Sequence, residues 1–165
     1  MNFDAHEIVP RLWMGSAPPF GRTLSRSGFN VLVLCAIEHQ PSSGNFPNVD
    51  VAYIDLDDDG NPIPREAFDK AIHLSRHLAH EIYRGKNVIV TCQQGRNRSG
   101  FITALTLMRL SGCDGRTAAK IVQARRASPF GPALTNRQFV AALRCISPAP
   151  RRGNLMAVAN HDSVV

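Results

Sequence analysis

The sequence predicts an α/β domain with a small, mostly parallel central sheet flanked by helices. The chain has 165 residues, the length of one domain with a sizeable core. Strand-like and helix-like segments alternate up to about residue 110, and helix-like segments then follow one another, which is typical of this fold class. No internal repeat and no change of composition divides the chain. We therefore expect one domain over residues 1–146 and a mobile tail over residues 147–165.

The expected strands are short and largely apolar. The segment EIVPRLWMGSAPP at residues 7–19 predicts one or two of them, with a turn at Gly15 and Pro18–Pro19. Next, VLVLCA is a continuous apolar run, VDVAYIDL alternates as a strand does, and NVIVT is rich in β-branched residues. These three expected strands lie at residues 31–36, 49–56 and 87–91, and a loop is expected at 38–48.

Apolar residues at helical spacing predict the helices. One face of the first would carry Phe68, Ala71, Ile72, Ser75, Ala79 and Ile82. Gly85 would end that helix. Asp114 and Thr135 are expected N-caps of later helices, because such side chains accept hydrogen bonds from the free N–H groups of a first turn. The expected helices cover residues 66–86, 99–110, 114–126 and 135–146.

The composition favours a globular protein with anionic partners. Hydrophobic residues make up 44% of the chain, and its formal net charge is +6. This charge favours phosphate esters, nucleic acid or acidic membrane surfaces as partners. No apolar run is long enough to span a bilayer and the N-terminus has no signal pattern, so a cytoplasmic location is expected. The four cysteines would then be reduced, and without a CxxC pair no structural zinc site is expected.

One stretch, TCQQGRNRSG at residues 91–100, combines a nucleophile with anion-binding groups. It joins an expected strand to an expected helix, and sites in α/β sheets form where strands end. The backbone N–H groups of such a loop, with those of the first helical turn, form a nest for an anion, and Gly95 permits the tight turn. Cys92 lies at the mouth of this nest, where the same N–H groups and the helix dipole would stabilise its thiolate.

Two residues after the turn complete the expected chemistry. Arg98 can hold two oxygens of one phosphate group with its planar guanidinium. Ser99 can donate a hydrogen bond to the sulfur of Cys92 and ease its departure in a second step. The stretch therefore supplies a nucleophile, a cradle for an oxyanion and an arginine clamp.

The segment from Cys92 to Gly100 resembles the Cys-x5-Arg-Ser/Thr signature of the cysteine-dependent protein tyrosine phosphatase superfamily, and the surrounding pattern is similar to its dual-specificity branch. The likeness runs from about Glu7 to Ile146. EIVPRLWMGS resembles the opening strands of that branch, FNVLVLCA its first core strand, and RR followed by NRQFVAAL the arginine and Asn-x-x-Phe segment near its end.

This resemblance implies a cysteine phosphatase-like fold and metal-independent hydrolysis of phosphomonoesters through a phosphocysteine intermediate, with no cofactor. Its substrates would be phosphotyrosine and phosphoserine or phosphothreonine in proteins, and phosphate, vanadate or sulfate-like anions would inhibit it. It implies catalytic roles for Cys92, Arg98 and Ser99. The phosphate loop would consist of Gln93, Gln94, Gly95, Arg96 and Asn97.

The family also uses an aspartic acid on an upstream loop to protonate the leaving oxygen. Three candidates follow one another in YIDLDDDGNPIP, and the family's apolar spacing places the acid at Asp58. Asp59, directly before Gly60, and Asp57 are the alternatives. A further interpretation is that all three aspartates only make the loop soluble and that none of them reaches the substrate.

Two departures from the family pattern keep other functions open. Thr91 stands where the family usually has a histidine that orders the loop. Asn97–Arg98–Ser99–Gly100 is similar to the ending found in RNA 5′-phosphatases of the superfamily, and a basic residue at Arg96 is similar to its phosphoinositide phosphatases. The alternatives are therefore a phosphatase of RNA 5′ ends or phosphoinositides, or a pseudophosphatase that binds phosphate without turnover.

Other residues with reactive side chains carry weaker signals. His73, His77 and His80 share one helix, and two histidines four residues apart can bind zinc, but the sequence offers no third ligand. We expect them on the polar face of the helix. Cys35 lies within an apolar strand and is expected to be a small core residue.

Overall fold

The strands form one sheet in the order β1-β2-β5-β3-β4 in the computed structural model, which describes residues 3–36 and 38–147. β1 pairs antiparallel with β2, and all other neighbours are parallel, as the sequence predicted. The tail expected at 147–165 lies outside the described residues except for Ser147. The strands are β1 (Ala5–Val9), β2 (Leu12–Gly15), β3 (Val31–Ala36), β4 (Asp50–Leu56) and β5 (Val88–Thr91).

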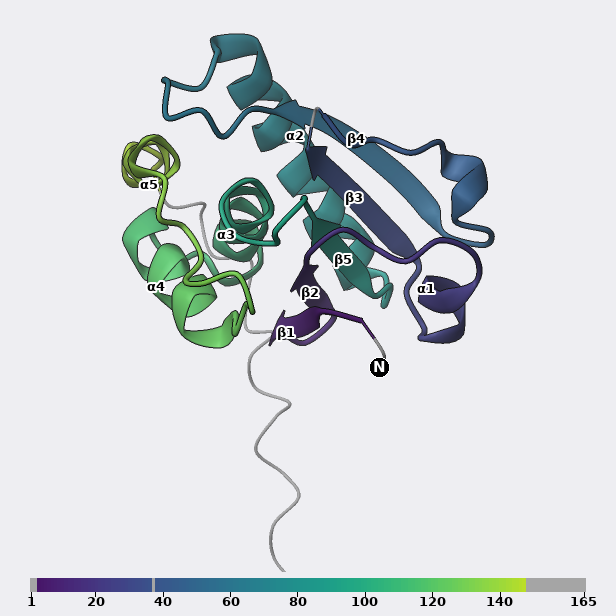
Figure 1. Cartoon of the computed structure of the whole chain (residues 1–165). Helices are drawn as coiled ribbons and strands as arrows, with labels where there is room; N and C mark the ends of the chain where they lie inside the picture. Colours follow the sequence, from purple (N-terminus) through teal and green to yellow (C-terminus); the bar gives the residue numbers. More distant parts are fainter. Residues whose placement is uncertain (1–2, 37, 148–165) are drawn as a thin grey trace, which may run out of the picture.

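Helices cover the sheet unequally (Figure 1). Four of them, α2 to α5, pack together on one side, while the single turn α1 lies on the other side. The helices are α1 (Thr23–Arg26), α2 (Arg65–Tyr83), α3 (Arg98–Ser111), α4 (Gly115–Arg125) and α5 (Arg137–Arg144), with a 3-10 turn η1 at Ser43–Asn45. Among the described residues, no helix is long and apolar enough to cross a membrane.

The alternation of side chains along β3 explains why both faces of the sheet are apolar. Every residue of β3 is buried, and successive side chains of a strand point to opposite faces. Val31, Val33 and Cys35 join the larger core beneath the four helices. Leu32 and Leu34 join a smaller core on the face covered by α1. A central strand therefore shows a continuous apolar run rather than an alternating pattern.

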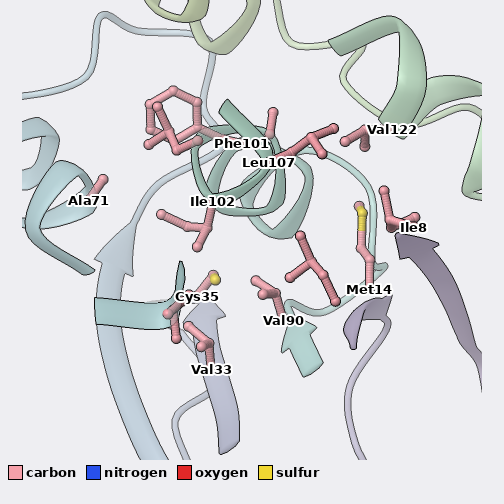
Figure 2. Packing of buried hydrophobic residues seen from close by; sticks show 14 of the residues in the cluster. Ile8, Met14, Val33, Cys35, Ala71, Val90, Phe101, Ile102, Leu107 and Val122 are labelled. Atoms are coloured by element: carbon pink, nitrogen blue, oxygen red, sulfur yellow. The ribbon is translucent and has the colours of Figure 1, made fainter. Parts of the chain in front are cut away.

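The helix α3 lies at the centre of the larger core. Its residues from Arg98 to Met108 are all buried. Figure 2 shows Ile102 of α3 above Val33 and Cys35 of β3 and Val90 of β5. The Phe101 ring stacks on the Phe139 ring of α5, with their centroids 5.1 Å apart. The loop before α3 is thus attached to the most buried helix of the domain.

The parallel pairing brings three strand ends to one edge of the sheet. Leu34 of β3 pairs with Thr91 of β5, and Ala36 of β3 pairs with Leu56 of β4. The residues that follow these strands therefore meet at that edge, as is usual for sites in α/β sheets. They are Glu38, the acidic run 57–59 and the loop that begins with Cys92.

Two local predictions were wrong. The turn predicted at Gly15 is absent, because Gly15 is the last residue of β2, and the turn between β1 and β2 lies at Pro10–Arg11. Arg11 adopts a left-handed conformation there with φ of 69°, and its guanidinium donates to the Gly85 carbonyl oxygen. The N-cap of α5 is Asn136 and not Thr135, because the Asn136 side chain accepts from the Gln138 amide.

The other two caps lie where the sequence predicted them. The Asp114 side chain caps α4 by accepting from the Thr117 amide over 2.7 Å. Gly85 follows the end of α2 with φ of +87°, a conformation that glycine adopts without strain.

Candidate active site

The loop that joins β5 to α3 holds Cys92 and Ser99 against each other. The sulfur of Cys92 lies 3.2 Å from the hydroxyl oxygen of Ser99. Ser99 is fully buried in the first turn of α3, and Cys92 is only 5% exposed. The two groups are therefore within hydrogen-bond distance, and a hydroxyl at this position can donate to a thiolate.

Arg98 is buried at the start of α3 and is held by Glu38. Its Nη1 donates to both carboxylate oxygens of Glu38, at 2.6 Å for Oε1. Burial opposes the charge of Arg98, but the Glu38 carboxylate and the nearby Cys92 raise its pKa on balance. The same hydrogen bond from Arg98 lowers the pKa of Glu38. Within the described residues, the buried Nε of Arg98 has no hydrogen-bond partner.

Close packing shows why the loop needs glycine at position 95. Gly95 has φ of +62°, and a Cβ atom there would lie 2.5 Å from both the Gly15 carbonyl carbon and Nη2 of Arg126. The Arg126 Nε donates to the Gly95 carbonyl oxygen over 2.9 Å. A side chain at this position would therefore strain the backbone and push β2 and Arg126 away from the loop.

Arg126 is anchored in turn by the N-terminal segment. It is 3% exposed, and its Nη1 donates to Asp4 Oδ1 over 2.7 Å and to Nδ1 of His6 over 2.6 Å. Partial burial raises the pKa of Asp4, but the hydrogen bonds from Arg126 and Ser16, together with nearby positive charge, lower the pKa overall.

The side chain of Thr91 forms its hydrogen bond with a neighbouring strand. Its hydroxyl, which is buried, donates to the Val33 carbonyl oxygen over 2.9 Å. This hydrogen bond links the end of β5 to β3 and gives the buried hydroxyl of Thr91 the partner that it needs away from water.

Of the three adjacent aspartates, Asp58 is the one whose carboxylate reaches the phosphate loop. Its Oδ2 accepts from the Asn97 side chain over 2.9 Å, and its Oδ1 accepts from the Asn136 side chain over 2.7 Å. Asp57 instead accepts from the Asp58 amide. Asp59 accepts from the Asn61 backbone amide, which lowers its pKa, and from the Asn61 side chain.

All the predicted site residues except Gly95 and Ser99 line one open pocket of about 470 Å³. It contains Glu38, Asp57, Asp58, Asp59, Cys92, Gln93, Gln94, Arg96, Asn97 and Arg98. A larger hollow of about 750 Å³ lies between β4 and α2 and contains none of these residues. The pocket at the strand ends therefore brings a thiol, a guanidinium and a carboxylate together.

The outer residues of the phosphate loop are attached to neighbouring loops. The Gln93 carbonyl oxygen accepts from the Ala17 amide, and the Gln94 carbonyl oxygen accepts from the Ser128 hydroxyl. The guanidinium of Arg96 donates to the Pro132 carbonyl oxygen over 3.0 Å and to the Thr135 hydroxyl over 3.2 Å. Arg96 therefore braces the loop before α5.

The sequence reasoning did not identify Glu38 or Asn136. Glu38 was assigned to a polar loop. It lies two residues after β3, and β3 pairs with the strand that precedes Cys92, so this position was the available signal that Glu38 lies near the site. Asn136 was included in the helix that it actually caps. Both residues contact a candidate catalytic side chain across 60 and 78 positions of sequence, respectively.

The remaining reactive side chains lie outside this pocket. Cys35 is fully buried, and burial raises the pKa of its thiol well above the ordinary value. Over residues 3–36 and 38–147, no cluster of three histidine, cysteine or acidic side chains is arranged to hold a metal ion. His73, His77 and His80 are part of that range.

The fold was compared with known proteins. No protein-family model and no curated protein sequence matches the chain. Solved structures do match it. Human DUSP28 superposes with a TM-score of 0.71 at 23% identity, covering 87% of this chain and 93% of that one. A mouse putative dual specificity phosphatase, solved with zinc tungstate, has a TM-score of 0.71 at 24% identity and coverage of 87% and 86%.

A third similar structure is the human tyrosine phosphatase-like serine/threonine/tyrosine-interacting protein. Its TM-score is 0.68 at 20% identity, with 87% of this chain and 95% of that chain covered. These superpositions extend over nearly the whole described chain. The chain therefore has the fold of the dual-specificity phosphatases, as the resemblance of its sequence implied.

Proposed function

We propose that this protein is a phosphomonoester hydrolase with a cysteine nucleophile, acting on phosphotyrosine and on phosphoserine or phosphothreonine in proteins. The observation that carries the proposal is the convergence of Cys92, Arg98 and Asp58 in one pocket, with the sulfur of Cys92 beside the Ser99 hydroxyl. A similarly folded phosphatase was solved with zinc tungstate, and tungstate is a tetrahedral oxyanion like phosphate.

In the first proposed step, the Cys92 thiolate attacks phosphorus and the bond from phosphorus to the leaving oxygen breaks. The N–H groups of residues 93–98 and the free Nε of Arg98 bind the phosphoryl oxygens, over which negative charge spreads in the transition state. Asp58 gives its proton to the leaving oxygen. Arg98 and the backbone supply the positive charge for this step.

In the second step, water attacks phosphorus and the bond from phosphorus to sulfur breaks. Asp58, now ionised, accepts a proton from that water. The Ser99 hydroxyl, 3.2 Å from the sulfur, donates to the departing thiolate. The products are inorganic phosphate and the regenerated enzyme, so phosphate and vanadate should inhibit by occupying the nest.

Acidic groups at the pocket favour this substrate class over polyphosphates. Glu38, Asp57 and Asp59 line the pocket beside the proposed acid, and they would repel a substrate with several phosphate groups. Arg96, the residue expected to contact a second phosphate under the RNA or phosphoinositide alternatives, donates to Pro132 and Thr135 instead.

Replacement of the nucleophile tests the proposal. Cys92→Ser should abolish turnover of phosphotyrosyl and phosphothreonyl peptides and retain vanadate binding, because a serine alkoxide is not accessible at neutral pH. The wild-type protein should be assayed beside it on these peptides, on phosphoinositides and on an RNA 5′-triphosphate. Residual turnover in the serine variant would contradict the covalent mechanism, and vanadate binding without any wild-type turnover would support the pseudophosphatase alternative.

A further inference from the structure

Three segments that lie far apart in the sequence meet around the Asp58 carboxylate. Asp58 belongs to the acidic loop after β4, Asn97 to the phosphate loop, and Asn136 to the start of α5. Each of the two asparagines donates one amide N–H to a different oxygen of Asp58, over 2.9 and 2.7 Å. The carboxylate is therefore held at two points and cannot rotate freely.

Backbone groups determine which way both asparagine amides face. The Asn97 Oδ1 accepts from the backbone amides of Thr135, over 2.8 Å, and Asn136, over 3.1 Å. The Asn136 Oδ1 accepts from the Gln138 amide over 2.8 Å. A backbone N–H requires an acceptor, so the oxygen of each side chain must face it and the NH2 group must face Asp58.

These contacts form a closed ring of hydrogen bonds. It runs from Asp58 to Asn97, from Asn97 to the Asn136 backbone amide, and from the Asn136 side chain back to Asp58. The other side-chain hydrogen bonds of the acidic loop, those of Asp57 and Asp59, stay within the loop. Among the described residues, the ring therefore supplies the side-chain hydrogen bonds that attach this loop to the pocket.

We propose that Asn97 and Asn136 are positioning residues that place the Asp58 carboxylate over the phosphate nest before substrate binds. This inference rests on the function proposed above, in which Asp58 is the general acid. One oxygen of Asp58 turns to the leaving group when substrate arrives, while the second bond keeps the loop in place. The two asparagines act through Asp58 and take no part in bond making.

The decisive variant is Asn136→Ser. Serine keeps an oxygen that caps α5, since serine is a good N-cap, but it is too short to donate to Asp58. Turnover of a phosphoserine peptide, whose leaving group is strongly basic, should fall by about tenfold or more, within the range that a general acid contributes. Turnover of para-nitrophenyl phosphate, whose leaving group departs without a proton, should change little.

A double-variant experiment separates positioning from general damage. In the Asp58→Asn background, Asn136→Ser should cause no further loss, because the group that it positions is already inactive. The matched control is Asn61→Ser in the same loop, whose side chain donates a hydrogen bond to Asp59. It should leave both substrates unaffected. Equal slowing of both substrates, or full additivity with Asp58→Asn, would overturn the inference.

Hydrogen exchange gives a readout that does not depend on turnover. The amides of residues 57–63 should exchange faster in Asn136→Ser than in the wild type, while those of α5 should not. Unchanged exchange in the acidic loop would also overturn the inference. If the wild-type protein hydrolyses no phosphate ester, the proposed function fails, and the exchange rates alone decide whether the ring holds the loop.

Discussion

At the scale of single residues, Arg98 divides its donors between two tasks. Nη1 is used by Glu38, while the buried Nε remains without a partner among the described residues. Glu38 is 45% exposed and Arg98 only 8%, so the pair lies where a protein surface meets its interior. Glu38 thereby holds the guanidinium at Nη1, and the Nε–H group is available to an oxyanion.

This division predicts that Arg98→Lys is nearly as damaging as Arg98→Ala. A lysine carries the charge on one nitrogen, which the Glu38 carboxylate would capture, so no group remains to hold the phosphate. We expect kcat to fall by about a hundred- to a thousand-fold, the usual cost of losing one such donor. Steady-state kinetics with para-nitrophenyl phosphate measures this, and thermal unfolding shows that the variants fold.

A second change tests the capture by Glu38. Adding Glu38→Gln to Arg98→Lys should restore part of the inhibition by inorganic phosphate, because the ammonium is no longer paired. Near wild-type activity in the single lysine variant would show that the planar fork of Arg98 is not used.

At the scale of secondary structure, the position of α5 depends on a glycine in α4. A Cβ atom at Gly115 would overlap the backbone of Leu143, closest to its carbonyl oxygen. The two helices can therefore approach each other only with glycine at this position. Because the first turn of α5 follows Asn136, this contact also helps to place one of the two donors to Asp58.

Gly115→Ala should destabilise the protein by about 1–3 kcal/mol, the usual cost of overpacking. The matched control is Gly44→Ala in η1, where the added Cβ would lie 3.9 Å from the nearest atom, the Ser42 hydroxyl oxygen. Both changes reduce the entropy of the unfolded chain equally, so this effect cancels between them. Urea denaturation at neutral pH gives the two free energies of unfolding, and equal stabilities would mean that α5 moves aside without cost.

The elements were predictable to different degrees from the sequence. β3 lies at 31–36 as predicted because a central strand buried on both faces must be continuously apolar. The N-cap at Asp114 was predictable because its partner, Thr117, is three residues away. The roles of Glu38 and Asn136 were not predicted, because they arise from contacts with distant residues, and the position of Glu38 just after β3 does not by itself identify its partner.

At the scale of the whole molecule, the phosphate loop is braced from the first described residues. Arg126, whose side chain is completely buried, links the Gly95 carbonyl oxygen to the Asp4 carboxylate, which is 17% exposed. Removing one partner of such a pair leaves a buried charge unpaired. The N-terminal segment thus contributes both to stability and to the shape of the site.

Asp4→Ala should therefore cost about 3 kcal/mol at neutral pH. The folded state lowers the pKa of Asp4, so the stabilisation is present above its ordinary value, about 3.9, and is lost as the pH falls through the folded value. The stability difference between wild type and variant should consequently be constant near neutral pH and shrink as the pH falls below about 4. Denaturation curves across that range measure it, and a difference independent of pH would assign the cost to packing alone.

The sequence separation of these partners also determines when the site forms during biosynthesis. Asp4 and Arg126 are 122 positions apart, and Asp58 and Asn136 are 78 apart. A ribosome adds about 5–20 residues per second, so Cys92 and Arg98 exist for several seconds before Arg126 and Asn136 are made. The nascent chain therefore contains Cys92 and Arg98 before Arg126 can bind the Gly95 carbonyl oxygen and before Asn136 can bind Asp58. The complete pocket can therefore form only after α5 has been synthesised and has packed against the rest of the domain.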